Sequence, residues 1–558
     1  MNSPKTVELR IIETSDVHGS FFSYNFIDRR PESGSLSRVM TYVDSLRRQY
    51  GDNLLLFDNG DILQGQPTCY YCNYINPEME NVAASIVNYM GYDAQTIGNH
   101  DIETGHEVYD KWVKEVKCPM LGANLIDTKT GQPYLQPYAI FHRENIKIAV
   151  LGMITPAIPN WLNENLWEGL RFEDIVESAA KWTQHLKSHE QPDIIIGLFH
   201  AGLHGGIVTS TYTENPVLEV AEKVDGFDLI LYGHDHVRHC QTVISPSGSP
   251  VLLLNPSASA MLVGDAKISV TFLDNGKKQK KVSGCLRDIR NLEVDNKLEQ
   301  HFKPAIDMVS AYVNRKVGVF KNAAYTRDCY FGNSAFSDFI HLLQLKITGA
   351  DISFNAPLTF NTCIPAGDVF MSDMFNLYRY ENQIYTMKLT GREILGHLEM
   401  SYDLWVNTME SPDDHIMLLT ENQTEGRRQV YFKNLAFNFD SAVGIDYEVD
   451  VTKPDGEKVN ILRMSNGQPF QLDKFYTVAM NSYRGNGGGE LLTRGAGIPQ
   501  EQLKERILWM SERDQRYYLA HEISKMEMAD PQPLNNWRFV PEEWTAKAIE
   551  RDRALLFK

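Results

Sequence analysis

The stretch "FDLILYGHDHVRH", residues 227–239, places a short apolar run directly before three histidines and an aspartate. Such a run is typical of a buried strand. The imidazole and carboxylate groups that follow it are side chains that bind transition metals. A single cluster of this kind is also compatible with a polar loop, so its meaning depends on whether other strands end in the same way.

Seven apolar runs in the first half of the chain predict strands that alternate with amphipathic helical stretches. The runs cover residues 7–15, 53–60, 93–99, 146–154, 193–201, 228–234 and 250–256. Their alternation with helices is typical of layered α/β folds. In open α/β sheets, ligands bind just beyond the carboxyl ends of the strands, so side chains distant in sequence are expected to meet at one edge.

Five of these runs end in residues of the metal-ligand type. They are Asp16 and His18; Asp58 and Asp61; Asn99, His100, Asp101 and Glu103; His200 and His204; and His234 and His236. One such turn could be explained by local capping hydrogen bonds, but five recurrences at the same place are hard to explain in that way. Side chains alternate along a strand, so His234 and His236 are expected to point the same way, with Asp235 pointing away. His239 is left out of the site.

The mixture of carboxylate, imidazole and one amide oxygen suits Zn, Mn, Fe or Co far better than Ca, and Mg is compatible with it. Seven or eight ligands are too many for one ion but fit two divalent ions that clamp the attacking and leaving oxygens of an in-line displacement. Two close ions need a bridging carboxylate. Asp61 lies in the glycine-flanked "NGDILQG" and is the expected bridge.

Composition limits the partners. The 558 residues favour two domains, and the formal net charge of −18 argues against binding polymeric DNA or RNA. No run approaches the roughly 20 apolar residues of a membrane span. The start, "MNSPKTVELR", lacks an apolar segment of signal-peptide type, so we expect either a cytosolic protein or a trimmed mature form.

The pattern changes after a hairpin predicted at 264–284. We expect a catalytic domain over 1–290, a charged connector helix within 291–318, a second α/β domain over 319–535 and a helical tail over 536–558.

The ordered set D-x-H, G-D-x-x-x-G, G-N-H-D, a lone histidine and G-H-x-H resembles that of calcineurin-like metallophosphoesterases over residues 8–265. The resemblance implies a four-layer β-sandwich flanked by helices. It also implies that one ion is held by Asp16, His18, Asp61 and His236, and the other by Asp61, Asn99, His200 and His234. His100 matches the family histidine that stabilises the transition state or protonates the leaving oxygen. Its orienting carboxylate is either Glu103, which we favour, or Asp101.

The second half resembles the C-terminal domain of 5′-nucleotidases in "GNSAFSDFIHLLQLKITGADISFNAP" (332–357), "IPAGDVFMSDMFNLYRYENQIYTMKLTGREI" (364–394) and "VAMNSYRGNGGGE" (478–490). In that group, two aromatic rings sandwich the base, and stacking suits any base because every base has a π-face. Tyr483 matches one ring. Phe437 in "NLAFNFDSAVGIDYEVDV" (434–451) is our choice for the other, with Phe439 as the alternative.

Two departures from the 5′-nucleotidase pattern refine the expected substrate. The segment "FNAPLTFNT" (354–362) lacks the arginines that bind a 5′-phosphate, and Gly489 stands where an aspartate is expected. "FNAP" with "NSYRGNGGG" is similar to the bifunctional 2′,3′-cyclic-nucleotide 2′-phosphodiesterases/3′-nucleotidases. The resemblance therefore implies a metal-dependent phosphoric ester hydrolase that converts 2′,3′-cyclic nucleotides to 3′-nucleotides and then to nucleosides.

Three alternatives stay open at this stage. They are a 5′-nucleotidase or UDP-sugar hydrolase, a sulfur-ester hydrolase on the same scaffold, and a catalytically silent nucleoside-binding protein. None of the expected metal ligands is missing, which argues against the last. Relatives are mostly exported, so the resemblance implies a periplasmic or cell-surface location with the signal peptide absent from this chain; a cytoplasmic location stays open.

Overall fold

The computed structural model describes residues 5–424 and 427–557. The chain forms two compact units, Met1–Tyr312 and Val313–Lys558. Each unit has its own sheets and its own core, so each is described by itself.

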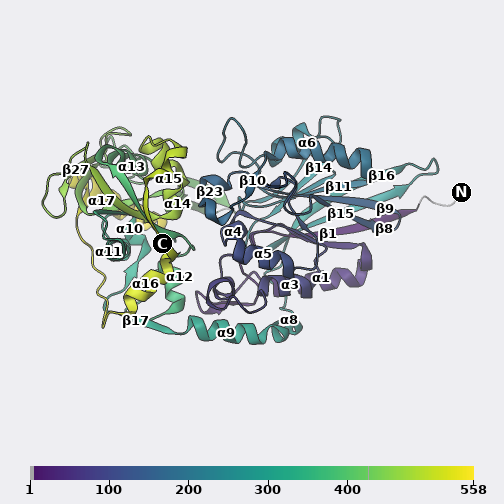
Figure 1. Ribbon diagram of the computed structural model, residues 1–558, viewed down its shortest axis with the longest axis horizontal. Coiled ribbons are helices and arrows are strands. Elements are labelled where there is room, and N and C mark those ends of the chain that lie inside the picture. The colour runs from purple at the N-terminus through teal and green to yellow at the C-terminus, as the bar shows by residue number, and fades with distance from the viewer. Residues whose placement is uncertain (1–4, 425–426, 558) are drawn as a thin grey trace. The chain divides into compact units, whose positions relative to one another are not determined.

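The first unit is built on two six-stranded mixed sheets (Figure 1). The first sheet has the order β16-β15-β1-β4-β5-β6, formed by Lys278–Asp288, Leu262–Phe272, Thr6–Thr14, Leu54–Asp58, Ala94–Thr96 and Met120–Leu121. The second has the order β13-β14-β12-β11-β9-β8, formed by Arg238–Ile244, Pro250–Pro256, Leu229–Tyr232, Ile194–His200, Ile146–Ile154 and Tyr138–Arg143. The expected hairpin near 264–284 corresponds to β15 and β16.

A hydrophobic core fills the space between the two sheets. Leu9 and Ile11 of β1 belong to the same buried cluster as Val150 of β9, Leu198 of β11 and Leu231 of β12, and all five are fully buried. Helices cover the outer faces, with α6 (Ile175–His185) on one side and α1 (Leu36–Tyr50) and α3 (Val82–Met90) on the other (Figure 1). The result is the helix–sheet–sheet–helix sandwich expected from the sequence.

The central strands of both sheets run parallel, and this places the site. β1 pairs in parallel with β4, and β4 with β5; in the other sheet, β9, β11, β12 and β14 are parallel neighbours. The carboxyl ends of parallel strands meet at one edge. The loops after β1, β4, β5, β11 and β12 therefore converge although almost 220 residues separate the first from the last.

Capping residues define the ends of the helices that cover the first sheet. The hydroxyl of Ser35 accepts a hydrogen bond from the Arg38 N–H at the start of α1. The side chain of Asn81 accepts two at the start of α3, and Gly91 ends that helix in the left-handed conformation. Such caps satisfy backbone groups that have no partner within the helix.

The expected connector is not one helix. The segment forms α8 (Asn296–His301) and α9 (Lys303–Val313), with a break at Phe302. Pro304 explains the break, because proline has no N–H to bond the carbonyl four residues before it and its ring clashes with that turn. α8 belongs to the first unit, and so does α9 except for its last residue, Val313.

The second unit is built on a five-stranded mixed sheet of order β25-β19-β28-β22-β29. The strands are Ser441–Val443, Ile352–Asn355, Phe475–Asn481, Gln383–Thr390 and Ile507–Asp514. Helix α13 (Gly391–Trp405) begins at a capping box between Thr390 and Glu393 and packs on the face that carries Ile352 and Phe354. Helix α11 (Ala335–Thr348) packs on the opposite face, where His341 hydrogen-bonds Ser353.

The last residues are an integral part of the second unit rather than a separate tail. β30 (Trp537–Val540) pairs in parallel with β26 (Ile445–Asp450), and α17 (Glu542–Leu556) follows it. Trp537, Phe539 and Ala548 lie in the same buried cluster as Trp405.

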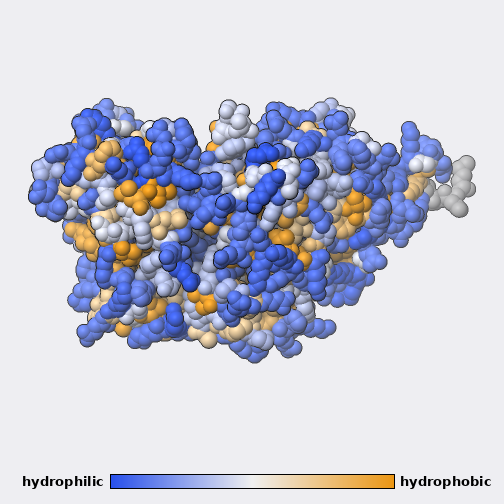
Figure 2. Space-filling view, in the orientation of Figure 1, coloured by the Kyte–Doolittle hydropathy of each residue, from blue (hydrophilic) through white to orange (hydrophobic). Residues whose placement is uncertain are grey.

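The visible surface is mostly hydrophilic, with apolar residues in small patches (Figure 2). Within residues 5–424 and 427–557, no helix is both long and apolar enough to cross a membrane.

Candidate metal centre

One cluster of ligand-type atoms is formed by Asp16, His18 and His236, whose ligand atoms lie within 4.8 Å of one another. Nε2 of His236 is 3.2 Å from Oδ1 of Asp16 and 3.1 Å from Nε2 of His18. Asp16 and His18 follow β1 and His236 follows β12, so the cluster joins the two sheets. Two imidazole nitrogens facing each other beside a carboxylate form a donor set suited to a divalent cation.

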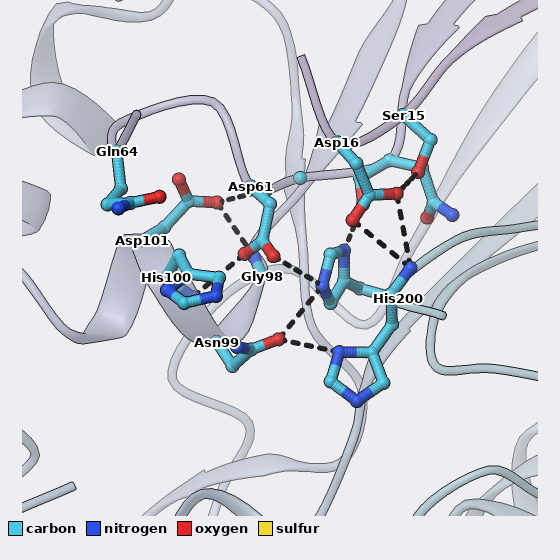
Figure 3. Close-up of polar contacts among 12 residues, drawn as sticks. Ser15, Asp16, Asp61, Gln64, Gly98, Asn99, His100, Asp101 and His200 are labelled. Atoms are coloured by element: carbon cyan, nitrogen blue, oxygen red, sulfur yellow. Dashed lines mark hydrogen bonds and ion pairs between the residues drawn. The ribbon is translucent and has the colours of Figure 1, made fainter. Parts of the chain in front are cut away.

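A second cluster is formed by Asp61, His200 and His234, again with ligand atoms within 4.8 Å of one another. Nε2 of His200 is 3.1 Å from Oδ2 of Asp61. The amide oxygen of Asn99 lies 3.1 Å from that nitrogen and 2.8 Å from Nδ1 of His234; Figure 3 shows its contacts with two imidazole rings. All four residues predicted to hold one ion are therefore in contact.

The backbone at this edge adopts a conformation that side chains rarely take. Asp16, His18, Asp61, His234 and His236 all have positive φ, between 49° and 73°. Non-glycine residues with positive φ are uncommon and cost energy, and they gather where function requires a fixed geometry. One expectation is corrected: His234 and His236 lie in a loop beyond Tyr232, so strand alternation does not orient them. The two residues lie in different clusters.

Neighbouring groups orient the histidines. Nδ1 of His200 is 2.7 Å from the carbonyl oxygen of Asn59, and Nδ1 of His18 is 3.1 Å from the side-chain oxygen of Gln64. Nε2 of His234 is 3.1 Å from Oε1 of Glu214. Glu214 was missed by the sequence analysis, because it lies in a long loop with no motif around it. Contacts of this kind fix ring orientation and tautomer in metal sites.

The structure separates the two carboxylates proposed to orient His100. Nδ1 of His100 is 2.6 Å from Oε2 of Glu103. The Asp101 carboxylate instead accepts backbone N–H groups of Asp61, Ile62, Leu63 and Gly98, at 2.8–2.9 Å. Asp101 therefore holds the loop that carries Asp61, and Glu103 is the carboxylate in contact with the His100 ring.

Burial and close charges set the protonation of the site. Burial opposes ionisation of Asp16, but His236 outweighs it and lowers the pKa of Asp16 to about 2. Burial is the largest cause that lowers the pKa of His18 to about 3, and the charge of nearby His236 is the second. Burial also opposes protonation of His200, yet Asp61 raises its pKa to about 10. An ionised carboxylate beside a neutral imidazole is the state that binds a cation. Asp16 and His18 are already in that state near neutral pH, whereas His200 must release its proton as an ion binds.

Several ligand-type residues of the same strand ends lie outside both clusters. Asp58 is buried and accepts hydrogen bonds from Thr14 and Gln95. His204 is exposed in the loop after β11. Asp235 accepts hydrogen bonds from the Leu203 backbone and the Asn255 side chain, as expected for a structural residue.

The second unit brings together the two aromatic residues chosen from its sequence. The rings of Phe437 and Tyr483 lie with centroids 6.1 Å apart at an interplanar angle of 85°. Phe437 belongs to a short helical turn, Ala436–Asn438, and Tyr483 to α14 (Ser482–Gly485). The alternative, Phe439, is 1% exposed and stacks on Trp405 at 5.5 Å, so its ring is part of the core.

Two protein families match the two units separately. Residues 9–238 match the calcineurin-like phosphoesterase family, and residues 316–494 match the 5′-nucleotidase C-terminal domain family. The fold and the first match define the class of this protein: it is a phosphoester hydrolase with a calcineurin-like catalytic domain. More particularly, its second domain is a 5′-nucleotidase C-terminal domain, so the chain has the two-domain architecture of that group.

Relatives with known names cover nearly the whole chain. The trifunctional nucleotide phosphoesterase protein YfkN of Bacillus subtilis is 27% identical over 98% of this chain, which spans only 40% of that protein. The 2′,3′-cyclic-nucleotide 2′-phosphodiesterase/3′-nucleotidase of Yersinia enterocolitica is 24% identical over 96% of this chain and 88% of its own length. The structure of a 5′-nucleotidase precursor from Thermus thermophilus shares the fold, with a TM-score of 0.65, 19% identity and coverage of 96% of this chain and 100% of that one.

Proposed function

We propose that this protein hydrolyses nucleotide phosphoesters at a centre of two divalent cations, opening 2′,3′-cyclic nucleotides to 3′-nucleotides and then releasing the nucleoside. The observation that carries the proposal is the meeting of two ligand clusters, Asp16/His18/His236 and Asp61/His200/His234, at one edge of the sandwich. Two clusters suit two ions better than one.

The donor set fits the ions. In the proposal, Asp16, His18, Asp61 and His236 hold one ion, and Asp61, Asn99, His200 and His234 hold the other. Oδ2 of Asp61 is buried with Nε2 of His200 3.1 Å away, and a cation bound by both atoms would satisfy the carboxylate. Nitrogen and oxygen donors favour Mn, Zn, Co or Fe, and Mg is compatible. When bound, the two ions supply an activated water and neutralise charge on the phosphoryl oxygens.

The protein's own groups then handle the leaving oxygen. His100 is one residue from Asn99 and presents a ring whose Nδ1 contacts Glu103, and the proposal assigns proton donation to its Nε2. Its backbone N–H donates to Oδ1 of Asp61 at 2.8 Å, which ties the acid to the bridging ligand. A protonated His100 would stabilise the ribose oxygen as the P–O bond breaks.

The nucleoside is proposed to stack between Phe437 and Tyr483. The Yersinia relative's name supports a cyclic or 3′-nucleotide substrate, as does the absence of arginine from residues 354–362. Turning the nucleoside so that its 2′,3′ side faces the ions leaves no use for a clamp on a 5′-phosphate. Export to the periplasm or cell surface belongs to the same proposal.

A 5′-nucleotidase is the second candidate, because the 5′-nucleotidase of Vibrio cholerae is 35% identical over 36% of this chain. Turnover of 2′,3′-cAMP, 3′-AMP and 5′-AMP by one preparation separates the two. We expect the cyclic and 3′ substrates to have the higher kcat/KM. A clear preference for 5′-AMP would refute the proposal and establish the alternative.

A further inference from the structure

A single buried guanidinium joins the two segments that carry the aromatic pair. Arg484 is 1% exposed and lies next to Tyr483 in α14. Its Nη2 donates to the carbonyl oxygen of Phe437 at 2.9 Å. Its Nη1 donates to Oδ1 of Asn438 at 3.2 Å and also to the carbonyl oxygen of Gly488 in the glycine-rich loop.

The guanidinium is itself fixed by a buried carboxylate. Nε of Arg484 donates to Oδ2 of Asp440 at 2.8 Å, and Nη2 reaches Oδ1 at 3.2 Å, which is a bidentate contact. Nε2 of His397 lies 2.8 Å from the same carboxylate, and the His397 ring stacks on Phe354 at 4.2 Å. Bidentate arginine–carboxylate pairs have a defined direction, so the guanidinium has little freedom to move.

The glycine-rich loop leaves room for this arrangement. Gly489 has φ of +70°, and a Cβ atom there would collide with Oδ1 of Asn438 and Nη1 of Arg484. The lack of a side chain at this position, noted in the sequence, therefore makes space for the guanidinium. The glycine-rich loop and the Arg484 side chain therefore pack against each other.

We propose that Arg484 is the positioning residue of the nucleobase site: it ties the Phe437 and Tyr483 segments together and thereby sets the preference for substrates that carry a base. The two rings meet edge to face at 6.1 Å, so one ring turns as the base stacks between them. This inference rests on the proposed stacking of the base between those two rings. The role assigned to Arg484 is confined to the segments that hold the base, so it should govern KM far more than kcat.

The test compares 2′,3′-cAMP with base-free ribose 2,3-cyclic phosphate in the full-length protein. We expect wild type to favour 2′,3′-cAMP through a lower KM, because stacking on aromatic rings contributes about 1–3 kcal/mol per base, or roughly 5- to 150-fold. Arg484→Lys keeps the charge but cannot bond both segments. The Arg484→Lys variant should lose most of the preference for 2′,3′-cAMP because its KM for that substrate rises. Its kcat on both substrates should stay within about threefold of wild type.

Arg516→Lys is the matched control. Arg516 is equally buried and donates to the carbonyl oxygens of Tyr378 and Arg379, but it contacts neither aromatic segment through these bonds. The Arg516→Lys variant should lose about as much thermal stability as Arg484→Lys but keep the preference for the substrate that carries a base. Loss of the preference in both variants would mean that any buried arginine has this effect, and would overturn the inference.

Gly489→Ala provides a test that keeps the arginine, should Arg484→Lys fail to fold. Its added methyl must displace Asn438 or the guanidinium, so it should raise the KM for 2′,3′-cAMP and leave the KM for ribose 2,3-cyclic phosphate unchanged. Variants that keep the wild-type preference would overturn the role of Arg484 and leave the proposed function intact. A wild type without any preference would overturn base stacking, and the inference with it.

Discussion

Replacing Glu103 with glutamine tests the orientation of His100. Oε2 of Glu103 lies 2.6 Å from Nδ1 of His100, and the two side chains are only 11% and 26% exposed. Glutamine can still accept this hydrogen bond but carries no charge. A hydrogen bond to a charged group contributes about 1.5–3 kcal/mol and a neutral one about 0.5–1.5, so the change removes about 1–2 kcal/mol from the stabilisation of a protonated His100.

That loss corresponds to a fall in kcat of roughly 5- to 30-fold. KM should change little, because the proton is needed as the leaving oxygen departs. Initial rates on 2′,3′-cAMP over a range of concentrations give both constants, and thermal unfolding checks that the fold is intact.

Asp101→Asn is the matched comparison, since both carboxylates were candidates. Asp101 accepts four backbone N–H groups of the Asp61 and Gly98 segments. Its replacement should lower the melting temperature and weaken metal binding. Wild-type kcat in Glu103→Gln, together with a reduced kcat in a fully stable, metal-loaded Asp101→Asn, would refute this assignment.

Three further predictions concern groups around the site and the core. Burial raises the pKa of Asp58 to about 7 from 3.8, so metal-free wild type should lose about 3 kcal/mol of unfolding free energy from this group as pH rises from 4 to 7. Urea denaturation of Asp58→Asn should lack that decline; an unchanged slope against pH would contradict it. Phe437→Ala should raise the KM for nucleotides with little loss of stability, whereas Phe439→Ala should cost about 3–5 kcal/mol of stability; the reverse result would exchange their roles. Glu214→Gln should weaken binding of one ion about tenfold in competition titrations with a chelating dye. Unaltered metal affinity would mean that the contact of Glu214 with His234 does not orient the histidine for metal binding.

Much of the catalytic unit could be predicted because its signals are local. Apolar runs mark the strands, and the ligand-type residues follow them directly. The break at Phe302 was also readable, since Pro304 cannot sit in the interior of a helix, but the charged periodicity around it favoured one helix. The pairing of β30 with β26 had no local signal, because some 90 residues separate the partners and only their packing on Trp405 brings them together.

The site was predictable for residues within motifs and not for those that act through space. Glu214 stands in a loop without periodicity, and only the fold brings it to His234. Phe437 and Phe439 could not be separated by sequence, since both lie in one short aromatic stretch. Burial separates them, with Phe439 stacked in the core and Phe437 beside Tyr483.

In the proposed mechanism, two divalent cations at the meeting strand ends make this protein a phosphoesterase. The most direct measurement adds Mn²⁺ or Zn²⁺ stepwise to chelator-treated protein and follows bound metal by mass spectrometry alongside hydrolysis of 2′,3′-cAMP. We predict two ions bound per chain and full activity only when both sites are filled. Full hydrolysis by protein that retains no metal, or maximal activity with a single ion, would contradict it.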